Sequence, residues 1–136
     1  MEARELGDAV RRIVERLKPA AIVLFGSRAR GDWGPWSDYD LLVIADFRES
    51  YLERVGKLIE LLKDVRIPIE PHPYTLEEAI SMLHKGNPTI VDALEEGVFL
   101  HLEPGAQRLL KEYHRLKSKG LKRTKTTIVV PRNECQ

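Results

Sequence analysis

The N-terminal half of the chain carries two apolar patterns of helical period. Residues 3–18 place their apolar side chains on one helical face, and Pro19 follows, which predicts a helix ending at the proline. Residues 49–63 repeat the pattern with Leu52, Val55, Leu58, Ile59 and Leu62. Each helix should therefore pack one face against a core.

Three short segments have the character of β-strands. Residues 20–25 and 39–45 are mostly apolar and are separated by a turn-rich stretch, as expected for buried strands. Residues 65–70 alternate apolar and polar side chains, the period of a strand with one covered face. Pro68 has no backbone N–H to donate, so this third strand is expected at a sheet edge.

The C-terminal half predicts further helices and strands. Thr75 and Glu78 have the spacing of a capping box, which predicts a helix to about Lys85. The other expected elements are a helix over 88–96, a strand over 98–102, a helix over 104–119 and, unless the end is disordered, a strand over 126–130. This order predicts an α/β (α+β) fold, with a small mixed sheet flanked by helices.

Composition favours one intracellular domain. The 136 residues are 43% hydrophobic and 32% charged, and we assign 1–119 to a single domain and 120–136 to a basic tail. The single cysteine, Cys135, excludes a disulfide framework and a cysteine-based zinc cluster, and it favours a reducing cytoplasm. Neither a membrane-spanning run nor the apolar core of a signal peptide is present, so we expect a soluble cytoplasmic protein.

The net charge of +1 conceals an asymmetry. Residues 1–107 hold 13 basic and 19 acidic side chains, whereas residues 108–136 hold 9 basic and 2 acidic ones. The simplest explanation of this basic C-terminal segment is a solvent-exposed helix and tail. The alternative is a surface that binds an acidic partner or nucleic acid, but the segment has few of the aromatic residues typical of nucleic-acid binding.

The most informative chemistry lies between the first two predicted strands. Asp38 and Asp40 stand at positions i and i+2 where the second strand begins, so their carboxylates point to the same face. Paired carboxylates suit Mg²⁺, although two exposed acids at a strand end are also common. Gly26 and Ser27 end the first strand, where a glycine lets the backbone approach a phosphate and Arg28 supplies charge. Neither a P-loop nor a dinucleotide-binding glycine motif is present.

Together these residues resemble the signature of the nucleotidyltransferase superfamily typified by DNA polymerase beta. Gly-Ser-Arg-Ala-Arg-Gly at 26–31 and Ser-Asp-Tyr-Asp-Leu at 37–41 are similar to motifs of the prokaryotic minimal nucleotidyltransferase (MNT) group. The resemblance implies a polymerase beta-like fold. It also implies a third carboxylate from a neighbouring strand, for which Glu70 is the best match and Asp64 a weaker one. MNT proteins more often carry aspartate there, so the longer Glu70 is a departure.

The resemblance further implies a reaction and its site residues. Asp38, Asp40 and Glu70 would bind two Mg²⁺ ions, Glu70 would accept a proton, and Gly26, Ser27 and Arg28 would bind the phosphates of ATP. AMP would pass to an acceptor hydroxyl and pyrophosphate would leave.

The short chain holds no acceptor domain, so the acceptor must come from a partner or from a second copy of the chain. MNT proteins are often paired with HEPN toxins, which implies a type VII-like antitoxin that adenylylates a tyrosine of its toxin. A small-molecule or RNA acceptor, and a non-catalytic module that neutralises by contact, remain alternatives.

Three aromatic residues near this segment keep two interpretations each. His72 either contacts the site or is an ordinary loop histidine. Trp33 and Trp36 either stack on a ligand or pack their loop against the domain, and we favour packing.

Overall fold

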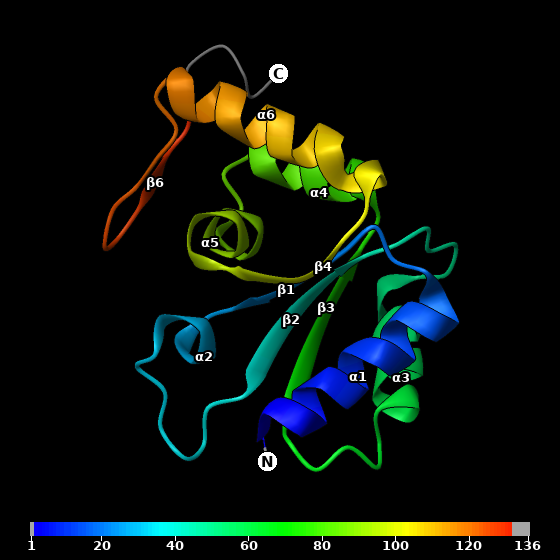
Figure 1. Cartoon of the computed structure of the whole chain (residues 1–136). Helices are drawn as coiled ribbons and strands as arrows, with labels where there is room; N and C mark the ends of the chain where they lie inside the picture. Colours follow the sequence, from blue (N-terminus) through cyan, green and yellow to red (C-terminus); the bar gives the residue numbers. More distant parts are fainter. Residues whose placement is uncertain (1, 132–136) are drawn as a thin grey trace.

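Four strands form one sheet at the centre of the protein. A computed structural model describes residues 2–131, and Cys135 lies outside them. The sheet order is β3-β2-β1-β4 (Figure 1). The strands are β1 (Ala21–Phe25), β2 (Tyr39–Ile44), β3 (Ile69–Tyr74) and β4 (Val98–Leu102). β1 pairs antiparallel with β2 and β4, and β2 pairs parallel with β3, so the sheet is mixed, as predicted.

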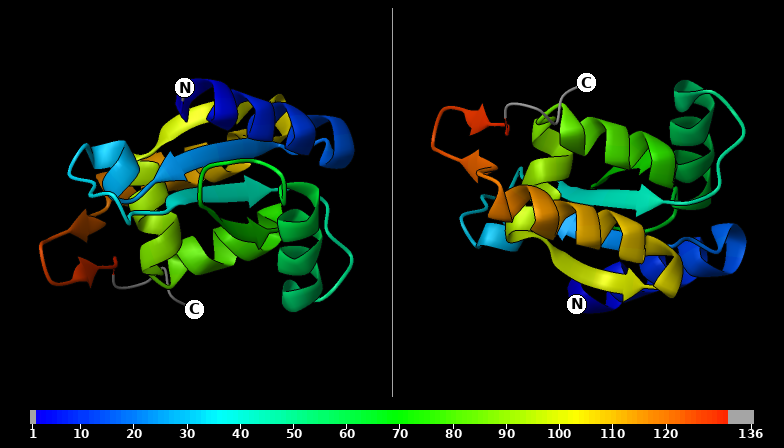
Figure 2. Two further views of the ribbon diagram at one scale, coloured as in Figure 1. Left: turned by 90° about the horizontal axis from the view of Figure 1, so that it is seen from below. Right: turned by 90° about the horizontal axis from the view of Figure 1, so that it is seen from above.

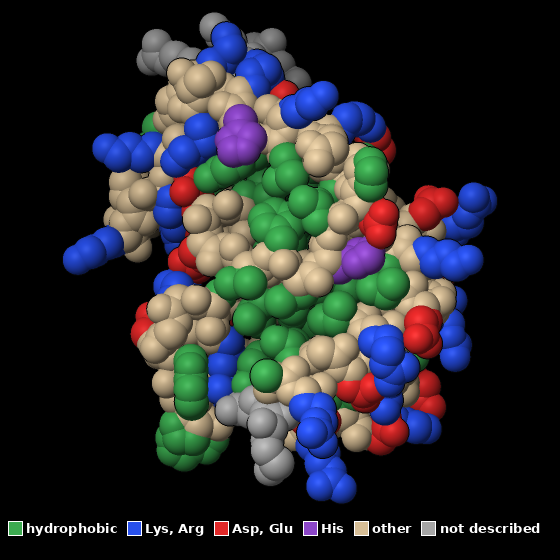
Figure 3. Space-filling model, viewed as in Figure 1, with side chains coloured by type: hydrophobic (Ala, Val, Ile, Leu, Met, Phe, Trp, Pro, Cys, Tyr) green, Lys and Arg blue, Asp and Glu red, His purple; other side chains and the backbone are tan. Residues whose placement is uncertain are grey.

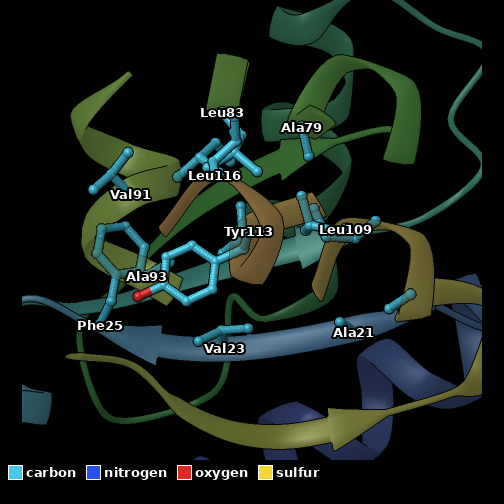
Figure 4. Packing of buried hydrophobic residues seen from close by; sticks show 14 of the residues in the cluster. Ala21, Val23, Phe25, Ala79, Leu83, Val91, Ala93, Leu109, Tyr113 and Leu116 are labelled. Carbon is cyan, nitrogen blue, oxygen red and sulfur yellow. The ribbon is translucent and has the colours of Figure 1, made fainter. Parts of the chain in front are cut away.

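Helices cover both faces of the sheet (Figures 1 and 2). One face carries α1 (Glu2–Leu17) and α3 (Tyr51–Leu61); the other carries α4 (Leu76–His84), α5 (Pro88–Glu96) and α6 (Gln107–Ser118). Alternate strand residues feed two separate cores. Figure 4 shows the core between the sheet and helices α4 to α6, where Val23 and Phe25 of β1 lie against Ala93 of α5 and Tyr113 of α6.

The helix predictions are confirmed to within a few residues. The capping box between Thr75 and Glu78 is formed, and α3 begins with a second one between Ser50 and Glu53. The helix predicted after Pro104 starts as a short 3-10 helix, η1 (Pro104–Ala106), before α6. Among residues 2–131, the helices are all too short or too polar to cross a membrane.

The third strand lies further along the chain than predicted. It spans 69–74 rather than 65–70, while its predicted position at a sheet edge is confirmed. The carbonyls of Pro68 and Tyr74 accept hydrogen bonds from the backbone N–H groups of Tyr39 and Ala45, so the backbone groups of even-numbered β3 residues face β2. Pro71 and Pro73 therefore have their nitrogens at the free edge, where no donor is needed.

The C-terminal residues fold back as a hairpin. β5 (Lys122–Arg123) pairs with β6 (Ile128–Val129), a shorter form of the strand predicted over 126–130. Leu121 is only 3% exposed, and Ile128 packs on the core of α4 to α6. The hairpin projects on the same side of the molecule as α2 (Ser27–Arg30) and the loop before β2 (Figures 1 and 2).

The outer edge strand β4 is apolar and accessible. Val98, Phe99 and Leu102 are each more than a third exposed. Figure 3 shows hydrophobic side chains gathered on the face along which β4 runs.

Candidate active site

The turn after β1 is shaped by a glycine. Gly26 has φ of 80° and ψ of −159°, a region that only glycine adopts readily, and it is the N-cap residue directly before the four-residue helix α2. A Cβ on Gly26 would lie 2.5 Å from Oδ2 of Asp40. The missing side chain thus lets this turn approach the carboxylate of Asp40, whereas the approach to a phosphate expected from the sequence stays a prediction.

Asp40 lies in the middle of this arrangement. It pairs with Phe25 on one side and with Glu70 on the other, and its side chain is 23% exposed. The pKa of Glu70 is raised above its ordinary value of 4.5, mainly by contact with the carboxylate of Asp40 and secondly by burial. The structure therefore brings together two of the three predicted carboxylates.

A histidine completes the cluster. Nε2 of His72 lies 3.1 Å from Oδ1 of Asp40 and 3.5 Å from Oε2 of Glu70. Its ring packs edge-on against Phe25, with centroids 5.0 Å apart. One ligand atom from each of Asp40, Glu70 and His72 lies within 4.8 Å of the others.

His72 was left undecided by the sequence because the third strand was predicted too early. With β3 over 69–74, Glu70 and His72 are two residues apart on one strand and share a face. The alternation of polar residues with Pro71 and Pro73 was the signal that could have identified this.

Asp38 and Asp64 have different surroundings. Asp38 is exposed in the loop before β2 and lies outside the three-residue cluster, although its charge also raises the pKa of Glu70. Asp64, the weaker candidate for the third carboxylate, instead pairs with Arg12 of α1.

Arg28 holds the loop that leads to Asp38. Its guanidinium carbon lies 4.2 Å from the ring centroid of Trp33 and 4.4 Å from that of Tyr39. Its Nε donates a hydrogen bond of 3.1 Å to the carbonyl of Ser37. Trp33 therefore packs on Arg28, although its side chain is 49% exposed, whereas the expected packing is wrong for Trp36, which is 88% exposed.

Ser27, the other residue predicted to bind phosphate, begins α2 directly after Gly26 and is half-buried. It therefore lies at the turn that approaches Asp40, next in the chain to the glycine.

The donor set fits a divalent cation. Asp40 and Glu70 offer hard carboxylate oxygens, and Asp38 stands two residues before Asp40 on the same segment. Mg²⁺ commonly uses one or two such carboxylates together with substrate phosphates. The carboxylates of Asp38, Asp40 and Glu70 are therefore suited to Mg²⁺, the ion that the resemblance implies.

The fold recurs in solved structures. A chain of a toxin–antitoxin complex with AMP-PNP aligns with a TM-score of 0.51 and 20% identity, over 82% of this chain and 90% of that one. A second match is a chain from the complex of tri-AMPylated Shewanella oneidensis HEPN toxin with MNT antitoxin. It aligns with a TM-score of 0.50 and 18% identity, over 87% of this chain and 91% of that one. At these identities the likeness concerns the fold, and the predicted polymerase beta-like fold is confirmed.

Sequence comparison identifies the family. A bifunctional uridylyltransferase/uridylyl-removing enzyme of Pseudomonas entomophila (strain L48) is 28% identical over 92 residues, 66% of this chain and 10% of that enzyme. The chain thus spans about a tenth of the length of that curated relative. Residues 7–115 match the family model of the nucleotidyltransferase domain, and the chain belongs to that family.

Proposed function

We propose that this chain transfers AMP from ATP to a hydroxyl of a partner protein, a tyrosine of a HEPN toxin, and thereby acts as its antitoxin. The observation that carries the proposal is the contact between Asp40 and Glu70 beside Gly26, in a chain of the nucleotidyltransferase family. The fold shared with a complex of tri-AMPylated HEPN toxin and MNT antitoxin supports the choice of partner.

Each site residue has a role in the proposed reaction. The acceptor oxygen bonds to the α-phosphorus, the bond from that phosphorus to the bridging oxygen breaks, and pyrophosphate leaves. Glu70, whose side chain is 57% exposed, is open to an incoming group and accepts the hydroxyl proton. Asp38, Asp40 and Glu70 would hold Mg²⁺, which would offset the negative charge of the triphosphate.

Gly26 and Ser27 bind the β- and γ-phosphates in this proposal. Glycine permits the closest backbone approach, and the serine hydroxyl can donate to a phosphate oxygen. A direct contact of Arg28 with phosphate stays a prediction, because its guanidinium is already engaged by Trp33, Tyr39 and Ser37.

Intact-mass spectrometry of the partner tests the proposal. The chain is incubated with ATP, Mg²⁺ and a candidate HEPN-family toxin, and an Asp38→Asn/Asp40→Asn double variant runs in parallel. Asp46→Asn is a matched control, because Asp46 is a 91%-exposed acid just beyond the other end of β2. We expect AMP additions with the wild type and the control only, and their loss when the acceptor tyrosine becomes phenylalanine. A stable complex without any mass gain would leave contact alone as the means of neutralisation.

UTP is a second candidate nucleotide. The likeness to a uridylyltransferase over 92 residues favours including it. Running ATP and UTP in competition shows which nucleoside monophosphate reaches the partner, because the two additions differ in mass.

A further inference from the structure

We propose that His72 is a nitrogen ligand of the metal site and makes it favour a divalent transition-metal ion such as Mn²⁺ over Mg²⁺. The inference rests on the metal role given above to Asp40 and Glu70. It adds a ligand of different chemistry and names the class of ion that this ligand selects.

The distances suit shared coordination. Ligand atoms at about 2.1 Å from an octahedral ion lie about 3 Å from each other. Nε2 of His72 is 3.1 Å from Oδ1 of Asp40 and 3.5 Å from Oε2 of Glu70, so one ion can contact all three groups with little movement. Within residues 2–131, this is the one group of three potential ligand residues that converges.

The imidazole is held in place from two sides. The backbone of β3 is paired to β2 in a defined register, with His72 opposite Leu42, and the ring packs edge-on against Phe25. Its side chain is only 18% exposed. A ligand that is oriented before binding loses little conformational freedom when an ion arrives.

The chemistry of the donor set decides which ion benefits. Carboxylate oxygens suit Mg²⁺ and Mn²⁺ alike, whereas imidazole nitrogen favours transition-metal ions over Mg²⁺. An imidazole beside two carboxylates therefore strengthens the binding of Mn²⁺ or Co²⁺ and adds little for Mg²⁺.

Direct metal binding to the full chain tests this. Free Mn²⁺ is measured by electron paramagnetic resonance and Mg²⁺ by competition, with and without AMP-PNP, for the wild type and His72→Gln. Glutamine keeps an amide donor for Asp40 but removes the imidazole. We expect His72→Gln to weaken Mn²⁺ binding about tenfold or more and to change Mg²⁺ binding much less. His101→Gln is the matched control, since His101, on β4, contacts the carboxylate of Glu103 and lies outside the three-residue cluster.

The outcomes separate this inference from the proposed function. An unchanged ratio of Mn²⁺ to Mg²⁺ affinity in His72→Gln would overturn the ligand role and leave the carboxylate site intact. A wild type that binds neither ion would overturn both. If His72→Gln does not fold, pulsed electron paramagnetic resonance of Mn²⁺ on the wild type decides, because a bound imidazole couples its ¹⁴N nucleus to the ion and an absent coupling refutes the proposal.

Discussion

A methyl group on Gly26 would lie 2.5 Å from Oδ2 of Asp40, closer than any relaxed contact allows. Gly26→Ala should therefore displace the carboxylate that lies between Phe25 and Glu70 in the sheet. We expect transfer activity to fall about 100-fold, the effect of a misplacement of about 1 Å at a reacting centre. Steady-state kinetics with the partner protein measure it.

Gly31→Ala is a control for the milder strain of a side chain in the left-handed helical region at the other end of α2. Gly31 also has a positive φ, 86°, but a Cβ there meets nothing within 4 Å. The Gly31→Ala substitution should lower the free energy of unfolding by about 1 kcal/mol and leave activity within a few-fold of wild type. Equal losses of activity in the two variants would show that strain in α2, and not contact with Asp40, limits the reaction.

Glu70 should destabilise the metal-free protein. Contact with Asp40 raises the pKa of Glu70, so ionising both carboxylates at neutral pH weakens the fold. Because the side chain is 57% exposed, solvent screens part of this effect. Glu70→Gln is expected to raise the melting temperature by about 3 °C in EDTA.

Added Mn²⁺ or Mg²⁺ should reverse that order. The ion stabilises the wild type by binding its folded form, whereas Glu70→Gln lacks one carboxylate and gains less. Thermal unfolding with and without the ion measures both effects. A lower melting temperature for Glu70→Gln in EDTA would mean that Glu70 is a structural residue.

Arg28 and Trp33 should act together on the loop before Asp38. Stacking of the guanidinium on Trp33 and Tyr39 and its bond to Ser37 fasten this loop. Arg28→Ala and Trp33→Leu are each expected to lower kcat about tenfold, because either change loosens the approach to Asp38. Trp36→Leu, at an 88%-exposed position, should leave stability unchanged.

The kinetic constants distinguish the two roles of Arg28. If it binds phosphate, Arg28→Ala raises KM for ATP while Trp33→Leu alters neither constant. That pattern would refute the loop-holding role.

Glu112 should make stability fall in acid. It accepts a hydrogen bond from Arg115 and lies 2.5 Å from Nε2 of His84, and these contacts, Arg115 foremost, lower its pKa from 4.5 to about 2. A carboxyl whose pKa is lower in the folded state stabilises the fold above its unfolded value, and the effect is lost as the pH falls from about 4.5 to 2. Glu112→Gln should flatten the decline of unfolding free energy between pH 5 and 3, as urea titrations would show. An unchanged slope would mean that the contacts do not persist in solution.

Local spacing is what the sequence predicts best. The capping box at Thr75 and the close approach of the Gly26 turn to Asp40 both involve positions at which short-range patterns draw attention, whereas a metal-binding role for Asp38 stays a prediction because Asp38 lies outside the cluster. His72 could not be identified, since its position depends on where an edge strand begins.

Prolines made that boundary hard to predict. Residues 65–70 alternate like a strand, but Val65 and Ile67 pack on the core of α1 and α3 from outside β3. The strand itself contains Pro71 and Pro73, which β-propensity disfavours and a free edge tolerates. The pairing of β2 with β3 therefore determines which side chains lie beside Asp40, and this pairing joins segments that are distant in the sequence.

Transfer of label from ATP tests the central claim most directly. The chain and a candidate HEPN-family toxin are incubated with ATP labelled at either the α- or the γ-phosphate, with Asp40→Asn in parallel. The account predicts that label from the α-phosphate alone enters the partner, that pyrophosphate is released in equal amount, and that Asp40→Asn abolishes both. Label from the γ-phosphate, or no label in a complex that still forms, would contradict it.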